Sequence, residues 1–274
     1  MAPTSKAYKN FDFLNSPEAR TIRMLCEYEE PKKRLDQQGV ENTIVFFGSA
    51  RSEASDEARA TLAAAKLAAK ADPIIDKKAQ AAVLKAERGV KLSQYYDDAR
   101  ELARRLTEWD IGRPDRMGYM VSTGGGPGMM EAANRGASEV VGGKSVGLGI
   151  SLPFEEKVNR YVPEELAFEF HYFFMRKYWF LYHVKAMVLM PGGFGTMDEL
   201  FETLTLRQTG KITKPVPTVL FGSDYWNSVL NMDAMIEWGT ISPGDPDLMH
   251  VSDTVDDAFD FLTTSLVENE TLGG

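Results

Sequence analysis

The sequence contains very little cysteine and very little histidine. Its 274 residues include one cysteine, Cys26, and three histidines at positions 171, 183 and 250. A single cysteine excludes an intrachain disulfide, which is typical of proteins in a reducing compartment. The histidines are scattered, and neither an HExxH motif nor a Cys/His cluster is present, so we expect no dedicated metal site.

Long apolar runs and a basic character are lacking as well. No stretch approaches the roughly 20 apolar residues that cross a bilayer, and "MAPTSKAYKNFDF" lacks the apolar segment of a secretory signal. Lys+Arg 31 against Asp+Glu 40 gives a net charge of −9, whereas nucleic-acid-binding proteins usually present a basic face. A local positive pocket can still bind a small phosphate. We therefore expect a cytoplasmic protein with a small-molecule partner and without a nucleic-acid or membrane partner.

Two common nucleotide-binding motifs are missing. A dinucleotide fingerprint aligned on the glycines of "TGGGPGMM" requires a glycine where the chain has Met129. The segment "GGKS" at 142–145 ends like a P-loop, but the glycine required upstream is Ser138, and a strand follows instead of a helix. These departures exclude an NAD-type dehydrogenase and a P-loop NTPase.

The chain does contain an alternation of apolar strands and helices. Strands are expected in "NTIVFFGSAR", "GYMVST", "KSVGLGISLP", "LAFEFHYFF", "KAMVLM" and "PVPTVLFG". Helices are expected from Ser16–Pro17, over 54–109 as two or three helices with a break at 71–75, after each glycine-rich loop, in "MRKYWFLYHV", as one helix over 224–239, and in "TVDDAFDFLTTSL". This alternation predicts an α/β fold with a mostly parallel sheet and helices on both faces.

The expected domain organisation is simple. Residues 1–40 are interpreted as an N-terminal helical arm, and residues 41–274 as a single domain with a helical insertion around 54–109. In such folds ligands bind at the carboxyl ends of strands near the topological switch point. The glycine-rich loops all follow expected strands, so we expect the site there.

The loop "TGGGPGMMEAA" at 123–133 is the first candidate. Its glycines allow close backbone approach, and a helix start favours an anion such as phosphate. A tight turn with close helix–strand packing explains the same residues equally well. The loop alone leaves both interpretations open.

The loop "PGGFGTMDEL" at 191–200 is the stronger candidate. Gly192, Gly193 and Gly195 clear side chains from the turn, and Thr196 offers a hydroxyl and an N–H at a helix start, which suits a phosphate. Thr196 and Glu199 also form a capping-box pattern, in which Glu199 only bonds back to the cap residue. The residues alone therefore leave open whether Glu199 is a functional carboxylate or a cap.

A basic pair, Arg176 and Lys177, precedes this second loop within the aromatic-rich "HYFFMRKYWF". A solvated surface pair is the default interpretation. The aromatic setting suits a surface poorly, and arginine suits a phosphate or carboxylate partner, so a binding role is the alternative.

Four segments together carry a resemblance: "GGGPGMMEAANRGA", "GISLPFEEKVNRY", "FFMRKYWFLYH" and "MPGGFGTMDELFETLTLRQTGKI". Over about 43–222 the chain resembles the LOG (Lonely Guy) family of cytokinin riboside 5′-monophosphate phosphoribohydrolases. Such enzymes cleave the N-glycosidic bond of a nucleoside 5′-monophosphate to free base and ribose 5-phosphate. The resemblance implies a Rossmann-like nucleotide-binding domain and a homodimer or larger homo-oligomer with its sites near the interface.

The resemblance also implies site residues. Arg176 and Glu199 would be catalytic, since a carboxylate stabilises the oxocarbenium-like transition state of glycosidic cleavage. The loop 192–196 would hold the phosphate. The implied substrate-binding positions are Gly48, Ser49, Gly125, Gly126, Glu155, Lys177, Gly192, Gly193, Gly195, Thr196 and Thr205.

Two alternatives are weighed against this function. The family's older label, lysine decarboxylase, would need a pyridoxal phosphate and an anchoring lysine, which the sequence does not frame, so we expect no cofactor. A non-catalytic nucleotide or molybdenum-cofactor carrier of the same fold would need the glycines but not the Arg176/Glu199 pair. The base stays open between adenine and an N6-modified adenine. The extra segments at 1–40, 54–109 and beyond 240 are typical of longer bacterial-type members.

Overall fold

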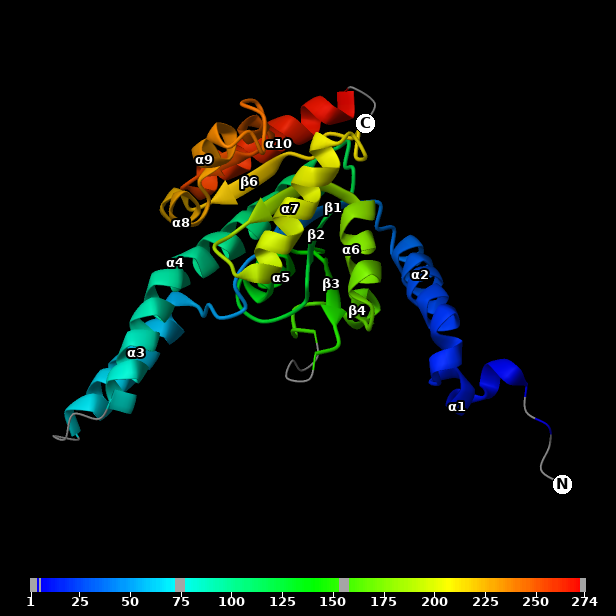
Figure 1. Ribbon diagram of the computed structural model, residues 1–274, viewed down its shortest axis with the longest axis horizontal. Coiled ribbons are helices and arrows are strands. Elements are labelled where there is room, and N and C mark those ends of the chain that lie inside the picture. Colours follow the sequence, from blue (N-terminus) through cyan, green and yellow to red (C-terminus); the bar gives the residue numbers. More distant parts are fainter. Residues whose placement is uncertain (1–3, 5, 72–76, 153–157, 272–274) are drawn as a thin grey trace.

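The computed structural model describes residues 4, 6–71, 77–152 and 158–271, and its centre is one seven-stranded sheet (Figure 1). All neighbouring strands are parallel, in the order β4-β3-β2-β1-β5-β6-β7. The strands are β1 (Asn42–Phe47), β2 (Tyr119–Thr123), β3 (Ser145–Ile150), β4 (Ala167–Phe170), β5 (Val184–Leu189), β6 (Thr218–Phe221) and β7 (His250–Ser252). The predicted Rossmann-like parallel α/β fold is confirmed, while the three-residue β7 was not predicted.

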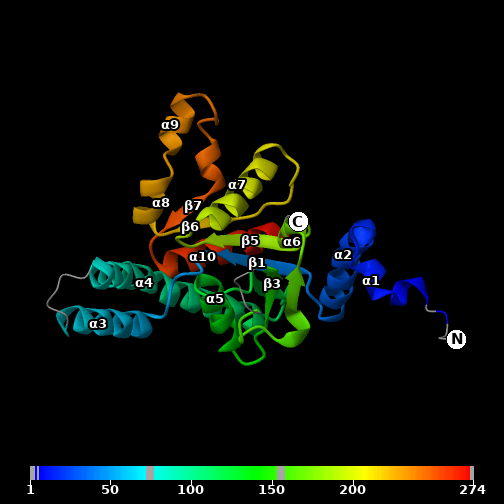
Figure 2. The same cartoon turned by 60° about the horizontal axis from the view of Figure 1, so that its bottom comes forward.

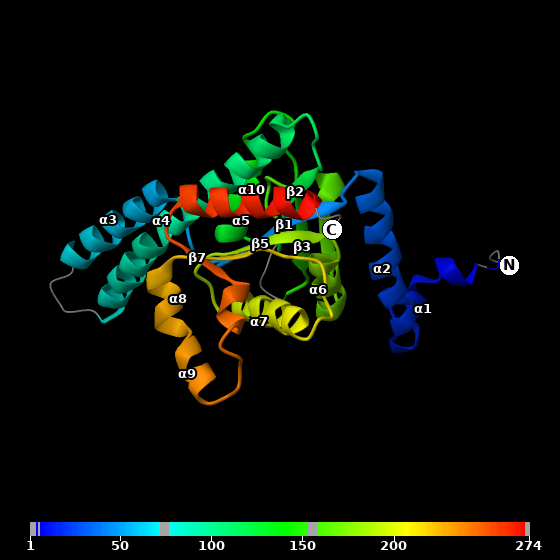
Figure 3. The same cartoon turned by 90° about the horizontal axis from the view of Figure 1, so that it is seen from above.

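Helices cover both faces of the sheet (Figure 3). The longer ones are α2 (Arg20–Gln37), α3 (Ser55–Ala71), α4 (Lys77–Gly112), α5 (Met129–Ser138), α6 (Phe173–Tyr182), α7 (Phe194–Gln208) and α10 (Val255–Thr271). Shorter ones in the described residues are α1 (Phe11–Leu14), α8 (Ser223–Val229), α9 (Met232–Glu237) and the 3₁₀ turns at Ala7–Lys9, Pro17–Ala19, Glu164–Leu166 and Asp245–Leu248. Within the described chain, no helix combines the length and the apolarity that a membrane span requires.

The sheet separates two hydrophobic cores. Ile44 and Phe46 of β1 pack with α4, α5 and α10 on one face, whereas the alternate residues Val45 and Phe47 pack with α2, α6, α7 and α8 on the other. Successive side chains of a strand point to opposite faces, so a fully apolar strand such as β1 serves both cores.

Strand β1 lies at the topological switch point. From β1 the chain moves outwards through β2, β3 and β4, and it returns as β5 on the other side of β1. The backbone pairing continues past both strand ends, because Met190 N–H donates to Phe47 O (2.8 Å) and Ser49 N–H donates to Pro191 O (3.0 Å). The loops that leave β1 and β5 are thereby held side by side.

Two helical projections extend from this body in opposite directions. The α3–α4 hairpin reaches beyond one side of the sheet, and α1 with α2 lies at the other (Figure 2). The prediction of two or three helices over 54–109 is confirmed as two, with most of the expected break at 71–75 outside the described residues. The division into a 1–40 arm and a 41–274 domain stays a prediction.

One local prediction was wrong, and a second holds only in part. The single helix over 224–239 is two helices: Leu230 is extended (φ −120°, ψ 122°) and the Asn231 side chain accepts a hydrogen bond from Ala234 N–H, which starts α9. An asparagine favours such a cap over a helix interior. The predicted helix start is confirmed in position, because Ser16 is the N-cap and Pro17 begins a 3₁₀ turn that continues directly into α2 at Arg20; only the expected capping bond of the Ser16 side chain is missing.

Candidate functional site

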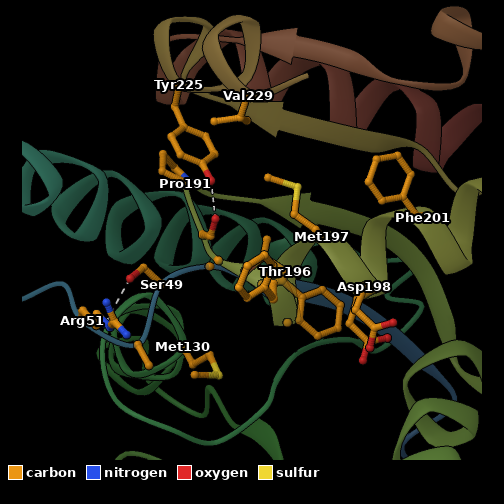
Figure 4. Close-up of a pocket in the computed structure, with 18 of the residues that line it drawn as sticks. Ser49, Arg51, Met130, Pro191, Thr196, Met197, Asp198, Phe201, Tyr225 and Val229 are labelled. Atoms are coloured by element: carbon orange, nitrogen blue, oxygen red, sulfur yellow. Dashed lines mark hydrogen bonds between the residues drawn. The ribbon is translucent and has the colours of Figure 1, made fainter. Parts of the chain in front are cut away.

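One large cavity opens where β1 and β5 end (Figure 4). Its volume is about 940 Å³, and its walls come mainly from residues 47–51 after β1 and 191–199 after β5. Helix α6 adds Phe173 and Arg176, and α8 adds Tyr225. The cavity therefore lies at the switch point, where this class of sheet binds its ligands.

The loop after β5 presents an open helix start to this cavity. Helix α7 begins at Phe194 with Gly193 as its N-cap, and the first N–H groups of a helix have no partner inside the helix. Gly193 and Gly195 are exposed, and a Cβ on either would meet no atom within 4 Å. The loop thus combines free space with the positive end of the helix dipole, which suits an anionic group.

Gly192 has a different role in the same loop. A Cβ on it would lie 2.0 Å from Thr196 Oγ1, so only glycine leaves room for the Thr196 side chain. The Gly192 carbonyl accepts a hydrogen bond from the Tyr225 hydroxyl, drawn as a dashed line in Figure 4. These contacts fix the direction in which the loop leaves β5.

Glu199 is not part of a capping box. Thr196 already lies inside α7, three residues after the N-cap Gly193, so the capping-box interpretation of the sequence is wrong. Glu199 is buried in the second turn, with 7% of its surface exposed, and it lines the cavity. Burial raises the pKa of Glu199 to about 7, while the positive charges of Lys177 and Arg176 oppose that rise.

Lys177 lies beside Glu199 and belongs to a cluster of charges. Its Nζ is 2.5 Å from Glu202 Oε2, 2.9 Å from Asp198 Oδ2 and 3.5 Å from Glu199 Oε1. Only 17% of its side chain is exposed, so the interpretation as a solvated surface lysine does not hold. Three carboxylates of α7 converge on this ammonium group.

Arg176 is anchored by the sheet. Its Nε–H donates to the carbonyl of Leu148 in β3 (2.8 Å), and its guanidinium carbon lies 5.1 Å from the Phe180 ring centroid. A Cβ on Gly124 would lie 2.4 Å from an Arg176 nitrogen, so this glycine gives the guanidinium its place. The loop after β2 therefore contributes to the site by making room for Arg176.

The same loop after β2 has no exposed helix start. Gly125 and Gly126 are buried, and the Asn159 amide donates to both of their carbonyls (3.1 and 3.2 Å). The first N–H group of α5, that of Met129, donates to Ser49 O (3.0 Å). Of the two interpretations of this loop, the geometry favours the tight turn.

The predicted site residues are thus divided by the fold. Those that line the cavity are Gly48, Ser49, Arg176, Gly192, Gly193, Gly195, Thr196 and Glu199. Gly125, Gly126 and Lys177 lie outside its lining, Thr205 lines a separate cavity of about 230 Å³ between α7 and α9, and Glu155 is outside the described residues. The assignment of these residues to substrate binding or catalysis stays a prediction.

Several lining residues were not predicted from the sequence. Arg51 lies after β1 next to Ser49, whose Oγ accepts from Arg51 N–H (3.1 Å, Figure 4). Asp198 and Met130 also face the cavity. The position of Arg51, just after the strand end "GSA", was the one available signal; Asp198 and Met130 carried none.

The fold and the cavity together define the class of protein. It is a Rossmann-like α/β protein that has, at its switch point, a loop suited to an anion and a buried carboxylate. The comparisons with known proteins go further. The family model described as "Possible lysine decarboxylase" matches residues 130–262. The chain is 34% identical over 158 residues to "Cytokinin riboside 5′-monophosphate phosphoribohydrolase LOG3" of Arabidopsis thaliana, and 32% identical over 157 residues to LOG4 of the same plant.

These alignments cover 56% of this chain in both cases, and 67% of LOG3 and 66% of LOG4, about two thirds of each relative. The chain belongs to the LOG family, whose named members are phosphoribohydrolases. The predicted resemblance is confirmed.

The description as a lysine decarboxylase does not fit the cavity. Such an enzyme would hold pyridoxal phosphate on a lysine. Among the described residues that line the cavity none is a lysine, and the nearby Lys177 ammonium is engaged by three carboxylates. Nor does the described part of the chain group three or more His, Cys, Asp or Glu side chains in a way that could hold a metal ion.

Proposed function

We propose that this protein hydrolyses the N-glycosidic bond of a nucleoside 5′-monophosphate, either AMP or an N6-modified AMP such as a cytokinin ribotide. The products would be the free base and ribose 5-phosphate. The observation that carries the proposal is the meeting of an open helix start and a buried carboxylate, Glu199, in one cavity. The printed names of the relatives support the same reaction.

The phosphate is assigned to the start of α7. The N–H groups of Phe194, Gly195 and Thr196 belong to the first turn, which favours a negative charge. Arg51 and Ser49 lie across the cavity from Asp198 (Figure 4), and Arg51 adds a positive charge to the wall of the same cavity. With the phosphate bound there, the ribose faces the second turn, which carries Glu199.

The reaction breaks the bond between C1′ of the ribose and the base nitrogen, and it forms a bond from C1′ to a water oxygen. Positive charge builds up on the ribose in the transition state, and the Glu199 carboxylate stabilises it. A carboxylate with a pKa near 7 can also take the proton of the attacking water. The departing base nitrogen takes up one proton, which replaces the proton that the attacking water gives to Glu199, so base release consumes one water and the atoms balance. Arg176 keeps its own proton and acts as a fixed donor and charge.

The alternative, a non-catalytic carrier of the same fold, accounts for the glycines but not for Glu199. Burial holds the Glu199 pKa near 7, which means that the fold keeps an ionisable group in a costly place. Such groups in clefts are frequently functional. A carrier of phosphate has no use for a carboxylate beside the phosphate site.

The test is to incubate the purified protein with AMP and with an N6-isopentenyl AMP, and to follow the free base by chromatography. Glu199→Gln is expected to lower the rate about 10²–10⁴-fold, the range for losing a charge or a general base at a reacting centre. Glu165→Gln is the matched control, because Glu165 pairs with Lys144 on the surface. Base release at the wild-type rate by Glu199→Gln would contradict the proposed role, and binding without base release from either nucleotide would favour the carrier.

A further inference from the structure

The proposed reaction does not require all of the charged groups that surround Lys177. Asp198, Glu199 and Glu202 stand on adjacent turns of α7 and share one ammonium group from α6. The cluster carries three formal negative charges and one positive charge. The side chains of Asp198 and Glu202 are 58% and 32% exposed, so water solvates their charges, whereas the Glu199 side chain is 9% exposed and is largely shielded from water.

The distances rank the contacts of Lys177. The ammonium lies closest to Glu202 (2.5 Å) and Asp198 (2.9 Å), and farther from Glu199 (3.5 Å). The two more exposed acids therefore hold the lysine, and the lysine presents its charge to the buried acid. Lys177 itself is not among the residues that line the cavity, while Glu199 is.

We propose that Lys177, held by Asp198 and Glu202, is the positioning residue that keeps the Glu199 carboxylate charged and fixed at the wall of the cavity. This inference rests on the proposed function, and it replaces substrate contact as the role of Lys177. In this role Lys177 does not touch the substrate, and it affects the reaction only through Glu199.

The surrounding charges support this role. The charges that act most strongly on Glu199 are those of Lys177 and Arg176 on α6 and of Asp198 and Glu202 on α7. Burial raises the Glu199 pKa most, Lys177 lowers it more than Arg176 does, and the two acids raise it. Loss of Lys177 and loss of Glu202 must therefore move the Glu199 pKa in opposite directions.

The experiment is the pH dependence of kcat/KM for base release from AMP, measured on wild type, Lys177→Met and Glu202→Gln. Because the ionised Glu199 is the active form, the wild-type rate falls below the Glu199 pKa of about 7. In Lys177→Met this fall in rate, the acid limb of the profile, should move to higher pH by about one unit. The rate of the variant should then be about tenfold below that of wild type at pH 6 and should approach it above pH 9. In Glu202→Gln the limb should move down, which raises the relative rate at pH 6.

Substrate contact by Lys177 predicts a different result. Lys177→Met would then raise KM by a similar factor at every pH, with the acid limb in its wild-type place, and that outcome would overturn the inference. Lys177→Arg, which keeps the charge, should restore most of the wild-type profile. Lys144→Met, which removes a surface ion pair with Glu165, is the matched control and should leave the limb unchanged.

A second measurement separates this inference from the proposed function. The titration of the Glu199 carboxyl carbon, followed by NMR in ¹³C-labelled protein without substrate and assigned with Glu199→Gln, needs no activity. An upward move of that titration in Lys177→Met, with no base released by wild type, would keep the positioning role and refute the hydrolase. Base release by wild type together with an unchanged Glu199 titration in Lys177→Met would support the hydrolase and refute the positioning role. If Lys177→Met does not fold, Lys177→Gln takes its place: its Glu199 titration should also move up, and an unmoved titration would overturn the inference.

Discussion

Two strand–loop–helix units flank β1, and they use the same sequence features for different purposes. One is β2 with α5, the other β5 with α7. Each has a glycine-rich loop, and each helix has a glycine as its N-cap, Gly128 or Gly193. In the first unit the glycines are buried and the first helical N–H donates to Ser49 O; in the second, Gly193 and Gly195 are exposed to the cavity.

The two helices also bury a polar side chain at the same position, the sixth residue. In α5 this is Asn134, and in α7 it is Glu199. Asn134 makes three hydrogen bonds: its Oδ1 accepts from Thr123 Oγ1 (2.7 Å) and Asn159 Nδ2 (2.9 Å), and its Nδ2 donates to Ser145 Oγ (3.0 Å). Glu199 instead has a raised pKa and a charge balanced by groups around it.

A glycine-rich loop before a helix therefore need not leave the helix start open. The two units differ in whether other parts of the chain fill the space next to the helix start. In the β2–α5 unit the chain itself, through Ser49 and Asn159, fills that space; in the β5–α7 unit it is left open. Hydrogen-bonded neutral groups fill the first unit, whereas the second keeps a buried ionisable group, a feature that is frequent at functional sites.

The largest expected effect tests the closed unit. Gly128 has φ +73°, and a Cβ on it would lie 2.2 Å from Ser49 O and 2.7 Å from the Ala50 carbonyl carbon. Gly128→Ala should therefore lower the free energy of unfolding by about 3–5 kcal/mol, from backbone strain and overpacking together. Urea unfolding measures the change.

Gly118→Ala is the matched control for Gly128. Gly118 has nearly the same φ, +71°, but open space around its Cβ position, so this substitution should cost only about 1–2 kcal/mol. Equal losses in the two variants would mean that the contact with the Ser49–Ala50 backbone contributes nothing, and the closed unit would not differ from an ordinary turn.

A smaller effect, of opposite sign, is expected from Glu199 at high pH. The folded-state pKa is raised from 4.5 to about 7, so the folded protein binds the extra proton and loses stability as pH rises between these values. Glu199→Gln removes that loss. The variant should equal wild type near pH 5 and exceed it by on the order of 2 kcal/mol at pH 8 in urea unfolding.

The converse substitution is Asn134→Asp in α5. It places a carboxylate at the equivalent position, where the described bonding partners Thr123, Ser145 and Asn159 are neutral, so its stability should fall steeply over the same pH range. A Glu199→Gln difference that does not depend on pH would show that Glu199 is not held with a raised pKa.

The smallest effect on stability is expected at the open loop. Gly195 is exposed, has no positive φ and has no atom within 4 Å of its Cβ position. Gly195→Ala should leave the free energy of unfolding unchanged or raise it by up to about 1 kcal/mol, because alanine favours the helix. The same methyl group occupies the space assigned to the phosphate, so AMP should bind about tenfold more weakly by calorimetry, a loss of about 1.4 kcal/mol. Unchanged affinity would place the phosphate elsewhere.

Much of the architecture could be read from local patterns. Apolar strands such as "NTIVFF" and "KAMVLM" and the glycines after them predicted a parallel α/β sheet with its site at the strand ends, because strand periodicity and turn chemistry depend on near neighbours. The three-residue β7 and the division of 224–239 into α8 and α9 were missed, since a short edge strand and an asparagine cap differ little from a loop and a helix in sequence. Arg51 was overlooked because its only signal was its position just after a strand end, and nothing in the neighbouring residues marks that arginine out.

The sequence by itself determined the family, the fold class and the two glycine-rich loops, since each is a property of consecutive residues. Only the tertiary structure decided which loop is open, that Glu199 is no cap, and that Lys177 pairs with Asp198, Glu199 and Glu202. These depend on which atoms from distant segments fill the same space and on how far water is excluded there. The burial of a side chain and the electrostatic potential around it depend on atoms from the whole fold, so they cannot be read from one stretch of the sequence.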